Sequence, residues 1–318
     1  MDNLRQAIYR THLFSRSKQS INGRKLHQDM DAMKKGWFSE LNELWPGVAL
    51  SLEVEEILHS ERSQFQDILV VKTKSHGRAL MLDGVIQTTE KDEMAYHEMI
   101  SYLPLCSHPK PQHVLIVGGG DGGAAREIAK HPDVERVTLV DIDDRVIELC
   151  KQYLPRLSLG LNNPKVHISV GDGFEFLRNH QEEFDIIVTD SSDPVGPAEN
   201  LFKQSYYELL KAALKPGGII ASQAGTAWMN MDQVRSTLQH CKTMFPVAAY
   251  AVTAVPTYPT GQIGFVLGSL NEQTNLTEPV KIFSDEDLDR MSMKYYNDKV
   301  HRAAFVLPRF VEKGLQSD

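Results

Sequence analysis

The feature that most constrains the fold is an alternation of strand-like and helix-like stretches that starts at residue 113. Short apolar runs typical of buried strands occupy residues 113–117, 137–141, 166–170, 184–189 and 218–222. Helical patterns follow each of them, at residues 122–130, 144–153, 173–179, 206–214 and 231–244. Alternation of this kind implies parallel strands joined by right-handed crossovers, so the sequence predicts a doubly wound α/β sheet.

The last elements of this pattern differ from those of a plain dinucleotide-binding domain. Two further strand-like runs, at 248–254 and 263–267, follow the last helical stretch with no convincing helix between them. We expect them to pair antiparallel as a hairpin. A doubly wound, Rossmann-like sheet that ends in this way is typical of the methyltransferase class.

The segment before the alternation is organised differently. Strand-like runs are separated by turn signals at 75–77 and 83–84 between residues 49 and 89, which predicts a small antiparallel sheet. Helical spacing at 91–102 predicts a connecting helix. Residues 1–35 are polar without sustained periodicity. The expected organisation is an extension, a small N-terminal antiparallel β-domain and a methyltransferase-like catalytic domain, at 1–35, 36–95 and 96–318.

Charge and composition exclude several classes of partner. The formal net charge of −8 disfavours nucleic acid and anionic membranes and is consistent with a cationic ligand. No apolar run approaches the roughly 18 residues that span a bilayer, and no signal-like apolar core is present. Cys106, Cys150 and Cys241 are scattered, with no metal-ligand spacing. These features predict a cytoplasmic protein with reduced thiols and no metal.

Two acids lie on a turn after the apolar run 184–188, in the order Asp190-Ser191-Ser192-Asp193-Pro194. Ligands of open α/β sheets bind at the carboxyl ends of the strands, where this turn is expected. Paired carboxylates there suit a cationic substrate, or removal of a proton from one. The alternative is a helix-capping turn, which for Asp193 alone is an adequate explanation.

A glycine turn follows the first strand of the alternation. Gly118, Gly120 and Gly123 satisfy G-x-G-x-x-G between a strand and a helix, which favours nucleotide or nucleoside binding over a purely structural turn. Asp121 inside the turn is either a cap of the next helix or a carboxylate facing the ligand. An acid there would repel a dinucleotide pyrophosphate and attract an amine, which argues against a dehydrogenase.

Four other positions are ambiguous from the residues alone. Asp141 ends the second strand, where a carboxylate can accept both ribose hydroxyls or simply be solvated. The Asp172-Gly173 pair suits recognition of an adenine edge, but is also a routine turn. His97 follows Tyr96 on the connecting helix, where a lone histidine is more often structural. Tyr258 lies on a proline-rich loop that forms either a lid or a turn.

The motifs VLIVGGGDGG, VGDGFEF, TDSSDPVGPA, PTYPTGQIGF and KYYNDKVHRAAFVLP resemble those of the spermidine synthase family. WFSELNELWPG, LDGVIQTTEKDE and YHEMI also match. The resemblance runs from about residue 36 to the C-terminus. It implies an aminopropyltransferase of polyamine biosynthesis that uses decarboxylated S-adenosylmethionine and putrescine, forms spermidine and 5'-methylthioadenosine, and assembles as a homodimer or homotetramer.

The resemblance also implies roles for individual residues. The ribose and adenine of the donor would be held by Gln66, Asp141, Asp172 and Gly173, and its aminopropyl amine by Asp121 and Asp190. Putrescine would be bound by Trp45, Tyr96, His97, Asp190, Asp193, Tyr258 and Ile263, with Asp190 deprotonating the attacking nitrogen. The segment 191–202 matches a loop that closes over bound ligands.

The chain departs from the family pattern at two positions, and rival functions remain. Asp141 stands where glutamate is frequent in the family, and His97 stands where some members have glutamine.

A putrescine N-methyltransferase has a segment that resembles DSSDP but lacks the acid of the glycine turn. Spermine synthase differs in the DSSDP segment. The sequence shows no set of residues arranged for hydride transfer, which argues against a dehydrogenase. A subunit that binds polyamine and regulates a partner is the non-enzymatic alternative.

Overall fold

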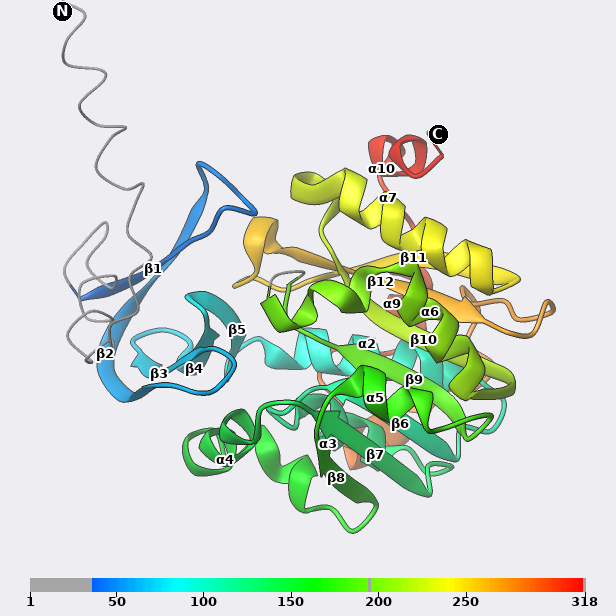
Figure 1. Cartoon of the computed structure of the whole chain (residues 1–318), viewed down its shortest axis with the longest axis horizontal. Coiled ribbons are helices and arrows are strands. Elements are labelled where there is room, and N and C mark those ends of the chain that lie inside the picture. Colours follow the sequence, from blue (N-terminus) through cyan, green and yellow to red (C-terminus); the bar gives the residue numbers. More distant parts are fainter. Residues whose placement is uncertain (1–35, 194–195, 317–318) are drawn as a thin grey trace, which may run out of the picture.

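The computed structural model describes residues 36–193 and 196–316, and the expected extension at 1–35 lies outside them. Five antiparallel strands form an N-terminal sheet in the order β1-β2-β3-β4-β5. Their bounds are Trp37–Leu41, Ala49–Arg62, Asp67–Thr73, Gly77–Leu82 and Val85–Thr89. The small antiparallel sheet is therefore confirmed. It forms an arm beside the larger domain, drawn in blue and cyan in Figure 1.

The larger domain contains a seven-stranded sheet in the order β11-β12-β10-β9-β6-β7-β8 (Figure 1). Its strands are β6 (His113–Gly118), β7 (Arg136–Asp141), β8 (Val166–Val170), β9 (Phe184–Asp190), β10 (Leu214–Gly225), β11 (Val247–Ala254) and β12 (Gln262–Ser269). Strands β8, β7, β6, β9 and β10 are parallel. The last two pair antiparallel, which confirms the predicted hairpin and the methyltransferase-like fold class.

Helices cover both faces of this sheet. They are α2 (Glu93–Ser107), α3 (Gly123–Lys130), α4 (Asp144–Tyr153), α5 (Gly173–Arg178), α6 (Gln204–Ala213), α7 (Ala227–Met244), α8 (Asp285–Arg290), α9 (Asp298–Ala303) and α10 (Arg309–Gly314), with short 3-10 turns η1 (Ser158–Asn162), η2 (Gly196–Phe202) and η3 (Pro259–Gly261). Helices α2 and α3 pack against one face of the sheet in one apolar core, and helices α6 and α7 pack against the opposite face in a second core. Among the described residues, no helix has the length and apolarity needed to cross a membrane.

Helix α2 and strand β10 are among the elements that extend beyond their predicted bounds. Helix α2 reaches Ser107 instead of residue 102 and contains Pro104. Leu103, Leu105 and Cys106 are fully buried there, so packing outweighs the local cost of proline. Strand β10 begins at Leu214 instead of residue 218, with an irregular register up to Ile219. The expected domain boundary between residues 95 and 96 lies inside α2.

The sheet order places the first strand of the alternation at its centre. Strand β6 pairs with β9 on one side and β7 on the other, so the chain reverses its winding direction at β6. The carboxyl ends of β6 and β9 are in register, with Gly118 opposite Asp190. This is the switch point at which open α/β sheets bind ligands. It brings the glycine turn and the acid turn together.

Asp92 joins the small sheet to the far end of the larger domain. Its Oδ1 accepts a hydrogen bond from Oγ1 of Thr89 at 2.5 Å. Its Oδ2 accepts from the backbone N–H of Thr257 at 2.9 Å and from Oγ1 of Thr257 at 2.8 Å. All three residues are buried. This carboxylate therefore fixes the loop that carries Tyr258 against the start of α2.

We expect Asp92→Ala to lower the free energy of unfolding by ~2–4 kcal/mol, because buried donors of Thr89 and Thr257 lose their acceptor. Asp232, whose side chain is 94% exposed, supplies the control. Asp232→Ala should change stability by less than ~0.5 kcal/mol. Urea unfolding measures both variants. A loss for Asp92→Ala no larger than that of the control would contradict the role of this carboxylate.

Candidate active site

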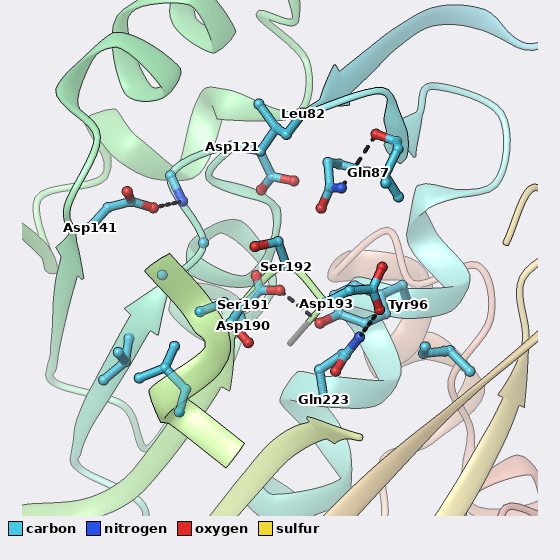
Figure 2. A pocket seen from close by; sticks show the side chains of 18 of the residues that line it. Leu82, Gln87, Tyr96, Asp121, Asp141, Asp190, Ser191, Ser192, Asp193 and Gln223 are labelled. Carbon is cyan, nitrogen blue, oxygen red and sulfur yellow. Dashed lines mark hydrogen bonds between the residues drawn. The ribbon is translucent and has the colours of Figure 1, made fainter. Parts of the chain in front are cut away.

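A cavity of about 220 Å³ opens at the switch point, between the small sheet and the larger domain. Its walls come from the glycine turn, the ends of β7 and β9, helix α2, the loop before β12 and strands β4 and β5. Every sequence-predicted site residue except Gly123 lines it. Figure 2 shows acids from two segments around this space, Asp121 from the glycine turn and Asp190 and Asp193 from the turn after β9.

The glycine turn lies against the end of β9. Gly118 and Gly119 have φ of 83° and 70°, which residues with a side chain rarely adopt. A Cβ at Gly118 would lie 2.2 Å from the carbonyl oxygen of Asp190, and the N–H of Gly119 donates to that oxygen at 2.9 Å. A Cβ at Gly120 would lie 2.7 Å from Oδ2 of Asp141. The turn therefore needs glycine to bring its backbone close to the neighbouring acids.

The expected donor-binding residues line one side of the cavity, with partners of their own. Asp141 accepts hydrogen bonds from the N–H groups of Gly120 at 2.8 Å and Asp143 at 2.9 Å. Burial raises the pKa of Asp141 to about 6. Nε2 of Gln66 donates to Asp143 at 2.9 Å. Asp172 accepts from the N–H of Phe174 and caps α5, so its carboxylate also has the structural role considered from sequence.

Asp190 has one occupied and one available carboxylate oxygen. Its Oδ1 accepts a hydrogen bond from the hydroxyl of Tyr96 at 2.8 Å (Figure 2). Its Oδ2 is buried and has no partner among the described residues. Burial and the nearby charge of Asp121 raise the pKa of Asp190 to about 6. At neutral pH, Asp190 is therefore an ionised group able to accept a proton or bind a cation.

His97 does not present a free nitrogen to the cavity. It is 2% exposed, with Nδ1 2.7 Å from Oε2 of Glu93 and Nε2 3.3 Å from Oδ2 of Asp121. These two acids outweigh burial and raise the pKa of His97 well above its usual value. Both ring nitrogens already face carboxylates, and the expected contact of this imidazole with the diamine stays a prediction.

The opposite end of the cavity combines apolar side chains with the carboxylate of Asp193. Trp45, Tyr258 and Ile263 line it. The hydroxyl of Tyr258 donates to the carbonyl of Gln87 at 2.6 Å. Asp193 accepts from Nε2 of Gln223 at 3.4 Å, and burial raises its pKa to about 6. An apolar stretch with acids at both ends matches a flexible ligand with a positive charge at each end.

Sequence reasoning missed Glu40, Gln223 and Asp143. Glu40 on β1 is 1% exposed; its Oε2 accepts from the N–H of Ile86 at 2.6 Å, and its Oε1 has no partner among the described residues. Burial raises its pKa to about 7, and the charge of Asp193 adds to the shift. A signal was present, because Glu40 lies two residues after the buried Phe38 and so takes a core-facing position of the strand.

Family models and curated relatives match most of this chain. The family model described as spermine/spermidine synthase domain matches residues 93–278, and the model described as spermidine synthase tetramerisation domain matches residues 36–90. A spermidine synthase of Dictyostelium discoideum is 53% identical over 286 residues, covering 90% of this chain and 99% of that protein. One of Schizosaccharomyces pombe is 49% identical over 278 residues, covering 87% and 93%.

Solved structures show the same likeness. A spermidine synthase in complex with the transition-state analogue AdoDATO superposes with a TM-score of 0.82 at 33% identity, covering 92% of this chain and 99% of that one. Spermidine synthase from Thermotoga maritima gives a TM-score of 0.80 at 32% identity, covering 93% and 99%. The likeness therefore extends over both sheets.

We expect Glu40→Gln to stabilise the protein at alkaline pH. The pKa of Glu40 is about 7 folded against 4.5 unfolded, so its contribution to stability is lost as pH rises through this window. The loss amounts to at most ~3 kcal/mol above the folded pKa. Glutamine keeps the acceptor for Ile86 without the charge. The variant should therefore exceed the wild type in unfolding free energy at pH 8 and match it near pH 4.5.

The exposed Glu43 on the following turn provides the control. Thermal or urea unfolding of Glu43→Gln should show no added pH dependence. If Glu40→Gln and Glu43→Gln follow the same curve between pH 4.5 and pH 8, the carboxylate of Glu40 is not the buried charge described above.

Proposed function

The chain belongs to the spermidine/spermine synthase family, and from this premise we propose how its residues carry out the reaction. The enzyme transfers an aminopropyl group from decarboxylated S-adenosylmethionine to putrescine, forming spermidine and 5'-methylthioadenosine. The observation that carries the assignment of roles is the pair of acids, Asp121 and Asp190, in one cavity at the switch point. Single oxygens of the two lie within 4.8 Å of each other and of His97.

The nucleoside of the donor is placed along the ends of β6, β7 and β8. Asp141 and Gln66 are assigned to the ribose hydroxyls, while Asp172 and Gly173 are assigned to the adenine. Their support is that all four line the same wall of the cavity as the glycine turn. Asp141 has a shorter side chain than the glutamate frequent in the family, and it is compatible with this role because the N–H groups of Gly120 and Asp143 fix its carboxylate directly beneath the turn.

Asp190 is assigned as the proton acceptor. The attacking nitrogen of putrescine forms a bond to the propyl carbon next to sulfur, the C–S bond breaks, and its electron pair neutralises the sulfonium. The proton lost by the nitrogen goes to Asp190, whose raised pKa makes it a better base than an exposed aspartate. Tyr96, hydrogen-bonded to the same carboxylate, orients the nitrogen. Holding both reactants in line supplies much of the acceleration.

The distal ammonium of putrescine is assigned to Asp193 and Glu40. Glu40 is buried and Asp193 is half-buried, both have raised pKa values, and Glu40 has an oxygen without a partner among the described residues. An ammonium would compensate their charge and reverse the cost of their burial. Trp45, Tyr258 and Ile263 are assigned to the methylene chain between the two ends.

Three further properties complete the proposal. The sulfonium makes methylthioadenosine a good leaving group without a Lewis acid, so we infer that no metal is required and that a chelator leaves turnover unchanged. The match of residues 36–90 to a tetramerisation domain supports assembly as a homodimer or homotetramer, which light scattering separates. Three buried free cysteines fit the reducing cytoplasm.

The decisive experiment incubates the purified chain with putrescine and either the decarboxylated or the ordinary donor, with products identified by mass spectrometry. Spermidine and methylthioadenosine from the decarboxylated donor alone are the expected result. N-methylputrescine from the ordinary donor would instead establish a methyltransferase, and spermine made from spermidine would establish a different acceptor. Absence of any product would favour a polyamine-binding subunit.

We expect Asp121→Ile to relax discrimination between the two donors. The ordinary donor carries a carboxylate, and two like charges about 4 Å apart cost roughly 4 kcal/mol at an effective dielectric of 20, about a thousandfold in affinity. Removing the acid should bring the Kd values of the two donors closer together, which isothermal titration calorimetry measures. Asp121→Asn is the isosteric companion variant. Unchanged discrimination in both would remove Asp121 as the filter.

We expect Asp190→Asn to lower kcat by ~10²–10⁴ because the proton acceptor is lost, with a smaller change in donor Kd. In the wild type, kcat/KM should fall as pH drops below about 6, since protonated Asp190 cannot accept a proton. Asp193→Asn, in the same turn, should chiefly raise KM for putrescine. Equal effects of both variants on kcat would contradict the division of roles.

A further inference from the structure

His97 in the cavity wall and Glu93 behind it form a pair that the proposed reaction does not use. They lie one turn apart on α2, with Nδ1 of His97 2.7 Å from Oε2 of Glu93. Nη2 of Arg126 donates to both oxygens of Glu93, at 2.9 and 2.7 Å. Glu93 does not line the cavity. Helices α2 and α3 thus hold this carboxylate from two sides.

The other ring nitrogen of His97 points at the acid of the glycine turn. Nε2 lies 3.3 Å from Oδ2 of Asp121, and the second oxygen of Asp121 accepts from the N–H of Gly123 at 2.7 Å. A Cβ at Gly123 would lie 2.4–2.5 Å from three ring atoms of His97. The third glycine of the motif therefore leaves space for this imidazole. Any side chain there would displace it from Asp121.

A ring between two carboxylates is best satisfied when both nitrogens carry protons. In a neutral ring, one nitrogen would direct its lone pair at a carboxylate. The charged groups around His97 are Glu93 on α2, Asp121 in the turn before α3 and Asp190 at the end of β9, with Arg126 of α3 behind Glu93. Burial alone would favour neutral His97, and the acids reverse that preference.

We propose that Glu93 keeps His97 as a buried imidazolium that positions Asp121 and offsets its charge, so that Asp190 is ionised beside it when the donor binds. The inference rests on the proposed roles of these two acids. Two carboxylates in one buried site oppose each other's ionisation, and a cation beside them favours it. His97 is thus a positioning residue, and Glu93 acts through it.

The first test is the protonation state of His97 in the full-length wild type, read from imidazole ¹⁵N shifts and assigned with His97→Gln. Both nitrogens should carry protons at pH 8, where a histidine with its usual pKa of about 6.5 is neutral. A neutral His97 at pH 7 would overturn the proposal. This readout needs no substrate, so it stands even if the chain were to transfer no aminopropyl group.

The second test is the pH profile of kcat/KM with the decarboxylated donor. The acid limb is the low-pH side of this profile, where kcat/KM falls as the pH drops. His97→Gln and Glu93→Gln should each move it up by about one pH unit, because removal of a nearby cation raises carboxylate pKa values. Glu127→Gln is the matched control, since Glu127 is 1% exposed and pairs with Arg126 and Lys130 at the far end of the network.

The control should lower stability and leave the acid limb in place. Acid limbs of His97→Gln and the wild type that coincide would overturn the proposal, as would a shift in Glu127→Gln equal to that in Glu93→Gln. His97→Lys restores a cation, and its acid limb should return toward that of the wild type. Loss of stability without movement of the limb would leave His97 a purely structural residue and refute the role.

Discussion

The rest of the site depends on the cost of burying several carboxylates where the two sheets meet. Asp141, Asp190, Asp193 and Glu40 all have pKa values raised by burial, to between about 6 and about 7. In an apoprotein near neutral pH the three aspartates are mostly ionised and Glu40 is partly ionised, in surroundings that disfavour charge. A ligand with positive charges removes that cost when it binds, so the same feature supplies both affinity and selectivity for polyamine-type cations.

The scaffold tolerates this acidity because backbone donors and a few cations fix the charges in place. Asp141 and Asp121 each accept N–H groups from the glycine turn, and Asp190 is anchored by Tyr96. Behind them, Arg126 neutralises Glu93, which in turn keeps His97 protonated. Each acid therefore has a defined direction before a substrate arrives, which is the condition for preorganised catalysis.

Local sequence patterns predicted most elements because their signals do not depend on distant residues. Strand β8 and helix α4 begin and end at the predicted residues 166–170 and 144–153. Strand β1 and the short helices α8, α9 and α10 were not predicted, and the bounds of α2 and β10 were wrong where tertiary packing overrides local preference. Pro104 lies inside α2 because the final turn of that helix is fully buried, and β10 continues through Pro216 by an irregular register beside β9.

The sequence by itself determined the alternation of strands and helices, the closing hairpin and the presence of acids at the strand ends, because hydrophobic periodicity and turn chemistry are local properties. Only the tertiary structure decided which acids face one another and which have partners. Glu40 of the small sheet lies close enough to Asp193 for its pKa to be affected, and His97 is enclosed by Glu93 and Asp121 from separate segments. Protonation depends on burial and neighbouring charge, which exist only once these segments pack together.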